Sequence, residues 1–511
     1  MSPRTFEDKI KTLADLVEIC RTLRAEGKRI VQCHGVFDLV HPGHLRHFEA
    51  ARAQGDLLVV TVTPDRFVNK GPGHPVFNER LRSESVAAVG SVAFAAVTES
   101  PSAEDVIRLL RPSVYVKGSD YADAKDDVTG KIADERQAVE EVGGRLHFTT
   151  EITFSSSSLL NRHYDVYPEE AQEFLRHFRQ RHSPGEVIGL LKDLRRVKVL
   201  VVGEAIIDEY HYVQSMQKSP KELLITTRYL REEHFAGGIL ACANHAAGFC
   251  DQVDMVTVLG AADSREDFIR AHLKPNVTPT FFRRDDTGTI VKRRYVDQAF
   301  LNKMFEVSFL DEGELPVPVS RQIEEHLAKV LPRYDVVIVA DYGHGFLNPE
   351  LIRVLTAESR FLALNVQTNS ANLGYNLISK YPRADYVCID EPEVRLAAHD
   401  RRSNLEELIE RVSKDMSCRR VSITRGHEGC IAYAEPADFF HVPVLSREIV
   451  DRIGAGDAYL SVTAPCAAAG YHPEVVGFIG NAVGALAVRI VGNRTAVEPV
   501  PLFKFITALL Q

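Results

Sequence analysis

The stretch HGVFDLVHPGH, residues 34–44, decides the fold of the first part of the chain. A β-branched run comes before it and a helical pattern follows it. Gly35 lets a phosphate approach the backbone closely, and Pro42 suits the first turn of a helix, where its missing N–H costs nothing. His41 and His44 are three residues apart, so both would face one anion at that helix N-terminus. The order of strand, glycine turn, paired histidines and helix predicts a phosphate-binding turn, whereas an isolated HxxH pair is more often two surface histidines.

Outward from this turn, short β-branched runs alternate with helical patterns, which is typical of parallel sheets covered by helices. These elements predict one doubly wound, Rossmann-like α/β domain over residues 1–165. Its strands are expected at 29–33, 57–63, 92–97, 114–117 and 146–149, and its helices at 7–26 and from about residues 41, 78, 102 and 131.

Residues 166–196 are charged, helical in pattern and broken by Ser183-Pro184-Gly185, and we interpret them as a helical linker. A second strand series predicts another doubly wound α/β domain over residues 197–511. Its strands are expected at 199–202, 254–259, 336–340, 361–364, 386–389 and 420–424, and two apolar helices at about 455–469 and 473–491 close it.

Composition narrows the function classes. The 511 residues are 45% apolar and 26% charged, an ordinary globular mixture that excludes disordered, collagen-like and coiled-coil chains. A net charge of −9 argues against a dedicated nucleic-acid or membrane-surface binder, which would need a basic field. The eight cysteines form no CxxC pair, so we expect reduced, buried thiols. Without an apolar leader or a long apolar run, we expect a cytoplasmic protein.

A second glycine turn, DRIGAGD at residues 451–457, precedes a helix of small apolar residues. Gly454, Ala455 and Gly456 would offer several backbone N–H groups to one anion at the helix start. Asp457 would lie at the edge of that anion, placed to take a proton from a hydroxyl that attacks a phosphate. The alternative is a tight turn capped by aspartate at a helix start.

The first constellation resembles the HxGH nucleotidylyltransferase superfamily, in particular its cytidylyltransferase-like branch. The segment VKGSDY at 116–121 closely resembles the nucleotidylyltransferase half of bifunctional ADP-heptose synthases, and Arg80 and Arg82 open the expected helix after Asn78. The resemblance implies that an acceptor phosphate attacks the α-phosphorus of ATP or CTP and that pyrophosphate leaves, with Mg²⁺ bridging the phosphates. It implies catalytic roles for His41, His44 and Lys70, and nucleotide contacts for Gly35, Phe37, Lys117, Asp120, Ser155 and Ser156.

The second part resembles ribokinase-like (PfkB-type) sugar kinases, with a small β lid at 211–234 that implies a homodimer. The resemblance implies ATP as phosphoryl donor and Asp457 as catalytic base. It implies sugar contacts for Asp208, Gly237, Gly238 and Asn244, and nucleotide contacts for Thr424, Gly426, Gly454, Ala455, Gly456 and Asn481. Lys292 lies on a probable strand and shares a face with Arg294, which would bind a phosphorylated sugar unless the charged run is only a solvated face.

This part also departs from the kinase pattern. Asn365 stands where the heptose kinases have an Asp-Pro-Lys-Gly-like motif, and Asp390 stands for the asparagine of N-x-x-E, whose glutamate, here Glu393, would organise Mg²⁺ indirectly. His344 replaces a lysine and either faces the sugar phosphate or is a plain loop histidine. The order of the two halves is the reverse of that in the bifunctional ADP-heptose synthases.

The sequence therefore predicts a bifunctional enzyme of nucleotide-sugar biosynthesis. The second domain would phosphorylate a heptose-like sugar or sugar phosphate, and the first would couple the sugar phosphate to a nucleotide. We expect small-molecule substrates, no nucleic-acid or membrane partner, and a homodimer through the kinase lid. The alternative is an active nucleotidylyltransferase, using CTP and a polyol phosphate, whose kinase-like half only binds or dimerises.

Overall fold

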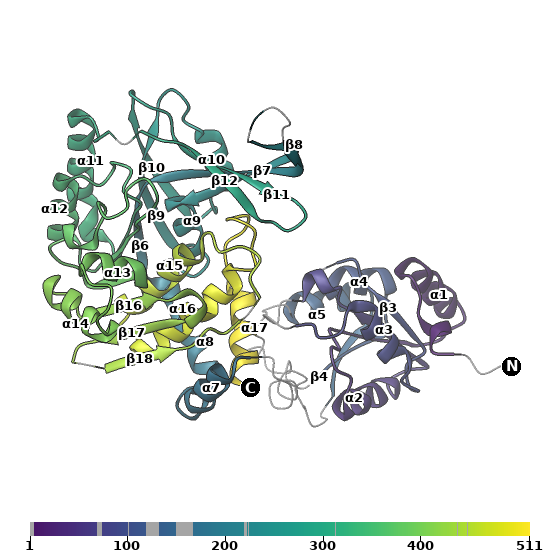
Figure 1. The fold of residues 1–511 in the computed structure, drawn as a ribbon. Coiled ribbons are helices and arrows are strands. Elements are labelled where there is room, and N and C mark those ends of the chain that lie inside the picture. The colour runs from purple at the N-terminus through teal and green to yellow at the C-terminus, as the bar shows by residue number, and fades with distance from the viewer. Residues whose placement is uncertain are drawn as a thin grey trace. The chain divides into compact units, whose positions relative to one another are not determined.

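The computed structural model describes residues 5–68, 74–100, 102–118, 132–149, 167–218, 222, 224–311, 313–436, 438–446 and 448–511. The chain divides into two compact units, residues 1–166 with 503–511, and residues 167–502 (Figure 1). Four of the predicted site residues, Lys70, Asp120, Ser155 and Ser156, lie outside the described residues.

The first unit holds the predicted parallel five-stranded sheet, in the order β3-β2-β1-β4-β5. The strands are β1 (Ile30–Gly35), β2 (Leu57–Val62), β3 (Phe94–Val97), β4 (Val114–Gly118) and β5 (Arg145–Thr149). Helices α1 (Leu13–Ala25), α4 (Ala103–Leu110) and α5 (Ile132–Glu141) pack on one face, and α2 (Pro42–Arg52) and α3 (Glu79–Ala87) pack on the other. The chain reverses its direction of winding between β1 and β4, so the 34–44 turn lies at the switch point where such sheets bind ligands.

The helix expected at 7–26 is shorter in the structure. A single 3-10 turn, Glu7–Lys9, comes first, and α1 begins only at Leu13. The Thr12 side chain accepts a hydrogen bond from the Asp15 N–H and so caps the helix at this point.

The second unit is built on a nine-stranded sheet in the order β10-β9-β6-β13-β14-β15-β16-β17-β18. The strands are β6 (Lys198–Gly203), β9 (Gln252–Gly260), β10 (Val277–Arg284), β13 (Val336–Asp341), β14 (Leu362–Val366), β15 (Tyr386–Asp390), β16 (Arg420–Thr424), β17 (Cys430–Ala434) and β18 (Asp438–Val442). All neighbours pair in parallel except at β17 and β18, which are antiparallel.

Helices cover both faces of this sheet (Figure 1). On one face lie α9 (Ile239–Ala246), α15 (Ala455–Ala468) and α16 (Pro473–Ala487), and on the other lie α11 (Val317–Val330), α12 (Pro349–Glu358), α13 (Glu391–Ala397) and α14 (Leu405–Asp415). Helix α10 (Glu266–His272) also belongs to the second unit, and in α17 (Pro499–Leu510) the residues from Phe503 onward belong to the first unit. Short 3-10 turns occur in the two units at Asp65–Phe67, Leu194–Arg196, Leu331–Arg333, Ile378–Lys380 and Gly426–Glu428.

The segment expected to be a linker forms two helices, α7 (Glu169–Arg181) and α8 (Pro184–Asp193). Both belong to the second unit. Arg181 pairs with Glu474 at 2.6 Å, the Phe178 and Phe478 rings stack at 4.4 Å, and the Tyr471 hydroxyl donates to the carbonyl of Leu190. These contacts fix α7 and α8 against α16.

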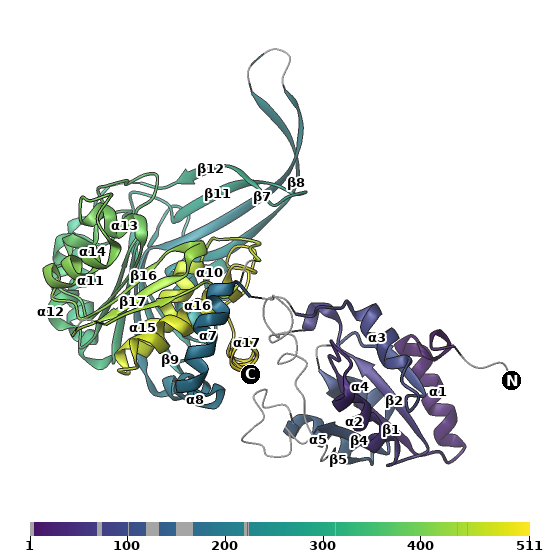
Figure 2. The ribbon, with the colours of Figure 1, turned by 60° about the horizontal axis from the view of Figure 1, so that its bottom comes forward.

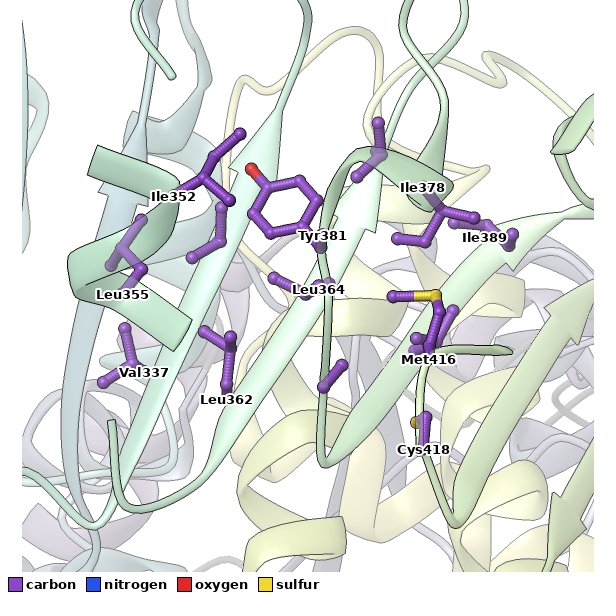
Figure 3. Close-up of a cluster of buried hydrophobic side chains, with 14 of the residues drawn as sticks. Val337, Ile352, Leu355, Leu362, Leu364, Ile378, Tyr381, Ile389, Met416 and Cys418 are labelled. Carbon is purple, nitrogen blue, oxygen red and sulfur yellow. The ribbon is translucent and has the colours of Figure 1, made fainter. Parts of the chain in front are cut away.

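The core between the main sheet and helices α11–α14 is mainly aliphatic (Figure 3). Leu364 and Val337 from the strands meet Leu355 from α12 in this cluster. Tyr381 places its ring in the same cluster, and its hydroxyl donates to the Asp341 carboxylate at 2.7 Å. Apolar side chains fill the space between the sheet and the helices, and polar side chains such as Asp341 lie at the carboxyl ends of the strands. All eight cysteines are buried and unpaired.

The predicted lid is confirmed as a separate mixed sheet with the order β12-β11-β7-β8 (Figure 2). Its strands are β7 (Ala205–Lys218), β8 (Ile225–Gly238), β11 (Ile290–Asp297) and β12 (Lys303–Phe309). β7 and β11 run parallel, with Asp208 opposite Lys292. Among the described residues, no helix has the length and apolar character needed to span a bilayer.

Candidate active sites

The first candidate site follows β1. His41 is the N-cap of α2, and its Nδ1 accepts a hydrogen bond from the Gly43 N–H at 3.1 Å. The His41 and His44 rings lie side by side, with centroids 4.0 Å apart. Phe37 adopts φ +49°, an unusual conformation for a bulky residue, and a Cβ at Gly35 would lie 3.0 Å from its ring. The structure thus brings Gly35, Phe37, His41 and His44 together at one helix N-terminus.

Lys117 lies at the end of β4, beside β1, and its Nζ is 2.9 Å from Glu135 Oε2 on α5. Burial, together with the Lys117 charge, lowers the pKa of His34 to about 3 and that of His47 to about 4. Both imidazoles are therefore neutral near pH 7. The His34 ring nitrogens lie 3.0 and 3.2 Å from the hydroxyls of Thr61 and Thr63. Lys117 therefore supplies a positive charge at this site, and that charge is already paired with Glu135.

Arg82 is fully buried, which the sequence did not indicate. Its guanidinium donates to the carbonyls of Val36, Thr63 and Phe77 at 2.5, 2.8 and 2.9 Å and pairs with Asp65. Arg82 therefore joins the turns that follow β1 and β2 and is fully engaged by the protein itself.

The second candidate site surrounds the start of α15. Gly454 is the N-cap with φ +82°, and a Cβ there would lie 2.1 Å from Asn493 Oδ1. Gly456 is exposed, and a Cβ there would meet nothing within 4 Å. The turn therefore has open space beside Gly456, while the Ala455 N–H makes a long 3.4 Å hydrogen bond to the Arg452 carbonyl.

The other predicted nucleotide contacts lie at the ends of neighbouring elements. Thr424 ends β16, and Gly426 begins a 3-10 turn with φ +56°. The Asn481 amide on α16 donates to the carbonyls of Val442 and Pro443 at 2.8 and 3.0 Å. Asn481 therefore holds the segment that follows β18.

Asp457, in the first turn of α15, accepts a 2.8 Å hydrogen bond from the Tyr342 hydroxyl on its Oδ1. Burial raises the pKa of Asp457 to about 6; the bond from Tyr342 and the charge of Lys292 oppose that rise, and Asp208 adds to it. A carboxyl group with this pKa is mostly ionised at pH 7 and can still accept a proton.

Asp208 and Lys292 face this group from the lid. Asp208 pairs with Arg294, which also pairs with Glu306 at 2.8 Å. A Cβ at Gly237 would lie 2.0 Å from Asp208 Oδ2, so glycine is needed for the carboxylate to occupy this position. Gly238 follows with φ +57° and leads into α9.

Two polar side chains at this site, those of Lys292 and His344, have no hydrogen-bond or ion-pair partner within the described part of the chain. Neither a hydrogen bond nor an ion pair reaches the partly buried Lys292 ammonium, and its pKa is lowered by burial. Both ring nitrogens of buried His344 also have no hydrogen-bond partner there. Burial and then the Lys292 charge lower the pKa of His344 to about 4. His344 and Lys292 are therefore electrostatic neighbours at the same site.

Asn244 is not brought to this group. Its amide donates to the His272 carbonyl at 2.8 Å, and its Oδ1 accepts from the Lys274 N–H at 2.9 Å. Two residues earlier on α9, the Cys242 sulfur lies 3.8 Å from the Tyr342 hydroxyl. Because residues two apart on a helix point in nearly opposite directions, the site receives Cys242 instead of Asn244.

Glu393 forms a capping box with Asp390 at the start of α13. Its two oxygens accept from the N–H groups of Thr368 and Asp390, each at 2.9 Å, and burial beside Asp390 raises its pKa. Mg²⁺ is held in proteins by one or two carboxylates, water and substrate phosphates. Asp390 and Glu393 fit a role through water, because both Glu393 oxygens already accept backbone hydrogen bonds.

Comparisons with known proteins match both units. Residues 33–163 match the cytidylyltransferase-like family model, and residues 348–499 match that of the pfkB family carbohydrate kinases. Bifunctional protein HldE of Desulfatibacillum aliphaticivorans is 36% identical over 146 residues, which cover 28% of each chain. Bifunctional protein HldE of Geotalea uraniireducens is 23% identical over 313 residues, which cover 61% of this chain and 63% of the relative. The matches thus span less than two thirds of these relatives.

Among solved structures, phosphofructokinase-2 from Escherichia coli in complex with substrates and products superimposes with a TM-score of 0.51. It is 13% identical and covers 62% of this chain and 100% of its own. At this identity the likeness shows the fold alone, a ribokinase-like fold with an additional small mixed sheet. Residues 33–163 are thus similar to cytidylyltransferase-like proteins and residues 348–499 to pfkB family carbohydrate kinases, and the chain is distantly similar to bifunctional HldE proteins over about 60% of its length.

Proposed function

We propose that the second unit transfers the γ-phosphoryl group of ATP to a hydroxyl of a sugar that already carries a phosphate. The observation that carries this proposal is the pair of Lys292 and His344 beside Asp208. Leaving an ammonium or a buried imidazole without a partner costs free energy, because neither group regains the hydrogen bonds it made to water. A phosphate bound between them would supply a negative charge and several acceptor oxygens to both.

The remaining groups suit the other parts of such a substrate. Asp208 would accept hydrogen bonds from sugar hydroxyls beside Gly237 and Gly238. Asp457 would take the proton of the attacking hydroxyl while the N–H groups of 454–456 hold the transferring phosphoryl group. Mg²⁺ would neutralise the phosphates of ATP, with Glu393 and Asp390 orienting its bound water. Thr424, Gly426 and Asn481 would border the nucleotide.

In the first unit, the phosphate of a sugar would attack the α-phosphorus of ATP or CTP, and pyrophosphate would leave. His41 and His44 would hold the triphosphate, and Gly35 and Phe37 would shape the pocket wall beside it. Lys117 would reach a phosphate in exchange for part of its contact with Glu135. Lys70, Asp120, Ser155 and Ser156 keep the roles that the resemblance implies. The product would be a nucleotide-linked sugar of the heptose type.

The kinase proposal is tested by ADP release from the full chain with ATP, Mg²⁺ and a panel of hexose and heptose phosphates beside their unphosphorylated forms. We expect release only with phosphorylated sugars. Lys292→Met should raise the KM for the sugar phosphate about 10-fold, the value of one lost ionic contact, with the KM for ATP unchanged. Arg293→Met is the matched control, because Arg293 points to the opposite face of β11 and pairs with Glu209.

Two results would contradict the proposal. Equal ADP release with phosphorylated and unphosphorylated sugars would mean that the substrate does not need a phosphate. No ADP release with any sugar, together with pyrophosphate release that survives Asp457→Asn, would favour the alternative in which the second unit only binds or dimerises.

The lid also suggests the oligomeric state. On its outer face the rings of Tyr229, His211, Tyr295 and Phe305 follow one another across all four strands, with centroids 5.9, 5.4 and 4.6 Å apart. Tyr229 and Phe305 are exposed, and exposed aromatic side chains are enriched at protein interfaces. We propose that a second copy of the chain covers this face.

A further inference from the structure

Tyr342, the first residue after β13, has every polar group engaged. Its N–H donates to Glu204 Oε2 at 3.1 Å, and its carbonyl accepts from the side-chain amides of Asn369 and Asn372, both at 2.8 Å. Its hydroxyl donates to Asp457 Oδ1 at 2.8 Å. The backbone of Tyr342 is thus fixed by Glu204, between β6 and β7, and by the loop after β14, and its side chain reaches α15.

The Tyr342 hydroxyl is a permanent donor. The residue is buried, and burial, followed by the charge of Asp457, raises its pKa well above the ordinary value. It therefore keeps its proton throughout the pH range in which the protein works. A donor that cannot titrate stabilises the ionised form of the carboxylate that accepts from it.

The environment of Asp457 would otherwise favour its protonated form. Burial and the charge of Asp208 both raise its pKa, while the bond from Tyr342, the charge of Lys292 and a weaker bond from the Cys242 thiol lower it. A carboxylate that must accept a proton has to be ionised and correctly oriented before the reaction begins. The bond to Oδ1 meets both needs, since it stabilises the charge and fixes the carboxylate, and Oδ2 is the oxygen that Tyr342 does not engage.

We propose that Tyr342 is a positioning residue for the phosphoryl transfer, which holds Asp457 by Oδ1 so that Oδ2 receives the proton of the sugar hydroxyl. This inference rests on the proposed kinase function. In the step, the hydroxyl proton passes to Oδ2, the sugar oxygen bonds to the γ-phosphorus of ATP, and the bond from that phosphorus to the β-γ bridging oxygen breaks. ADP leaves with the electron pair, and Asp457 returns its proton to water after the product departs.

Tyr342→Phe removes only the hydroxyl. In assays of ADP release with ATP and an accepted sugar phosphate between pH 5 and 9, we expect kcat at pH 7 to fall about 10-fold, within the range for a disturbed general base. The acid limb of the pH profile should move upward by about one pH unit, because one hydrogen bond to the carboxylate is lost. The KM values for both substrates should change less than about two-fold.

Tyr381→Phe is the matched control. It removes a buried hydroxyl that donates to Asp341, the residue next to Tyr342, and leaves Asp457 untouched. A general loosening of the 341–345 loop would lower kcat in both variants at every pH without moving the limb. A Tyr342→Phe profile that keeps the wild-type acid limb would overturn the proposal.

A second measurement needs no catalysis and separates this inference from the kinase proposal. Because the pKa of Asp457 is raised, its ionisation costs stability as pH rises from the unfolded value through about 6. The Tm advantage of Asp457→Asn over wild type should therefore grow over that range and then level. In the Tyr342→Phe background, the Tm difference made by Asp457→Asn should keep growing to a higher pH before it levels. Identical curves in the two backgrounds would refute the contact's role even if the kinase reaction were never observed.

Discussion

At the scale of single residues, Arg82 and Arg80 lie two positions apart, yet we expect the loss of each side chain to change the stability of the first unit by very different amounts. Removing the Arg82 side chain, as in Arg82→Leu, would leave three carbonyls and Asp65 without their buried donor, at a cost of about 3–5 kcal/mol. We expect the thermal transition of the first unit to fall by several degrees. Nucleotide-dependent pyrophosphate release should be lost with it, because the turns after β1 and β2 carry the site.

Arg80→Leu is the control, since Arg80 is exposed and, among the described residues, its side chain pairs only with Glu84 one helical turn away. Such surface pairs contribute about 0.3–0.5 kcal/mol. Calorimetry of the two variants beside wild type checks the difference. If Arg82→Leu unfolds at the wild-type temperature, the buried guanidinium does not join the two turns as described.

At the scale of elements, the hydrophobic pattern predicts the first sheet and six of the nine strands of the second, because parallel strands buried on both faces are continuous apolar runs, whereas β10, β17 and β18 at the edges of the second sheet are not among the expected strands. Helix ends were harder to place, as at Thr12, where a side-chain cap overrides the apolar spacing. The motif after Gly238 predicts Asn244 at the site. Because a helix turns about 100° per residue, α9 places Cys242 there instead, two residues before Asn244.

The roles of buried polar residues lie beyond sequence patterns for a related reason. Tyr342 meets Asp457 across 115 residues of chain and Glu204 across 138 residues, so only the folded sheet brings them together. Glycine turns and helix starts are local signals, and the structure has a turn and a helix start at both predicted places, before α2 and before α15. Partners that depend on strand order have no local signal in one sequence.

At this same scale, the lid sheet leads to a testable prediction about the oligomeric state of the chain. If its outer face is covered by a second copy, Phe305→Glu should place a charge in that interface and convert a dimer into a 57.0 kDa monomer in size-exclusion chromatography with light scattering. Phe300→Glu is the matched control, because Phe300 is more exposed but lies in the turn between β11 and β12. A monomeric wild type, or a Phe305→Glu dimer, would refute the proposed interface.

At the scale of the whole molecule, the two proposed reactions need no shared residue. Each unit has its own sheet, its own glycine turn at a helix start and its own titratable groups, so damage to one should leave the other working. We expect His44→Ala to abolish pyrophosphate release from ATP or CTP with a sugar phosphate, while ADP release by the kinase reaction stays within about two-fold of wild type. Asp457→Asn should show the reverse.

The reversed order of the halves sharpens this expectation. If an intermediate had to pass directly from one site to the other, exchanging the order along the chain would alter the path between them, whereas diffusion through solvent makes the order irrelevant. Equal amounts of His44→Ala and Asp457→Asn, mixed and supplied with the substrates of both reactions, should then show both activities at about half the wild-type rate per total protein, by simple dilution. Loss of both activities in either single variant would mean that the two sites depend on each other, which would contradict the prediction that the two units work independently.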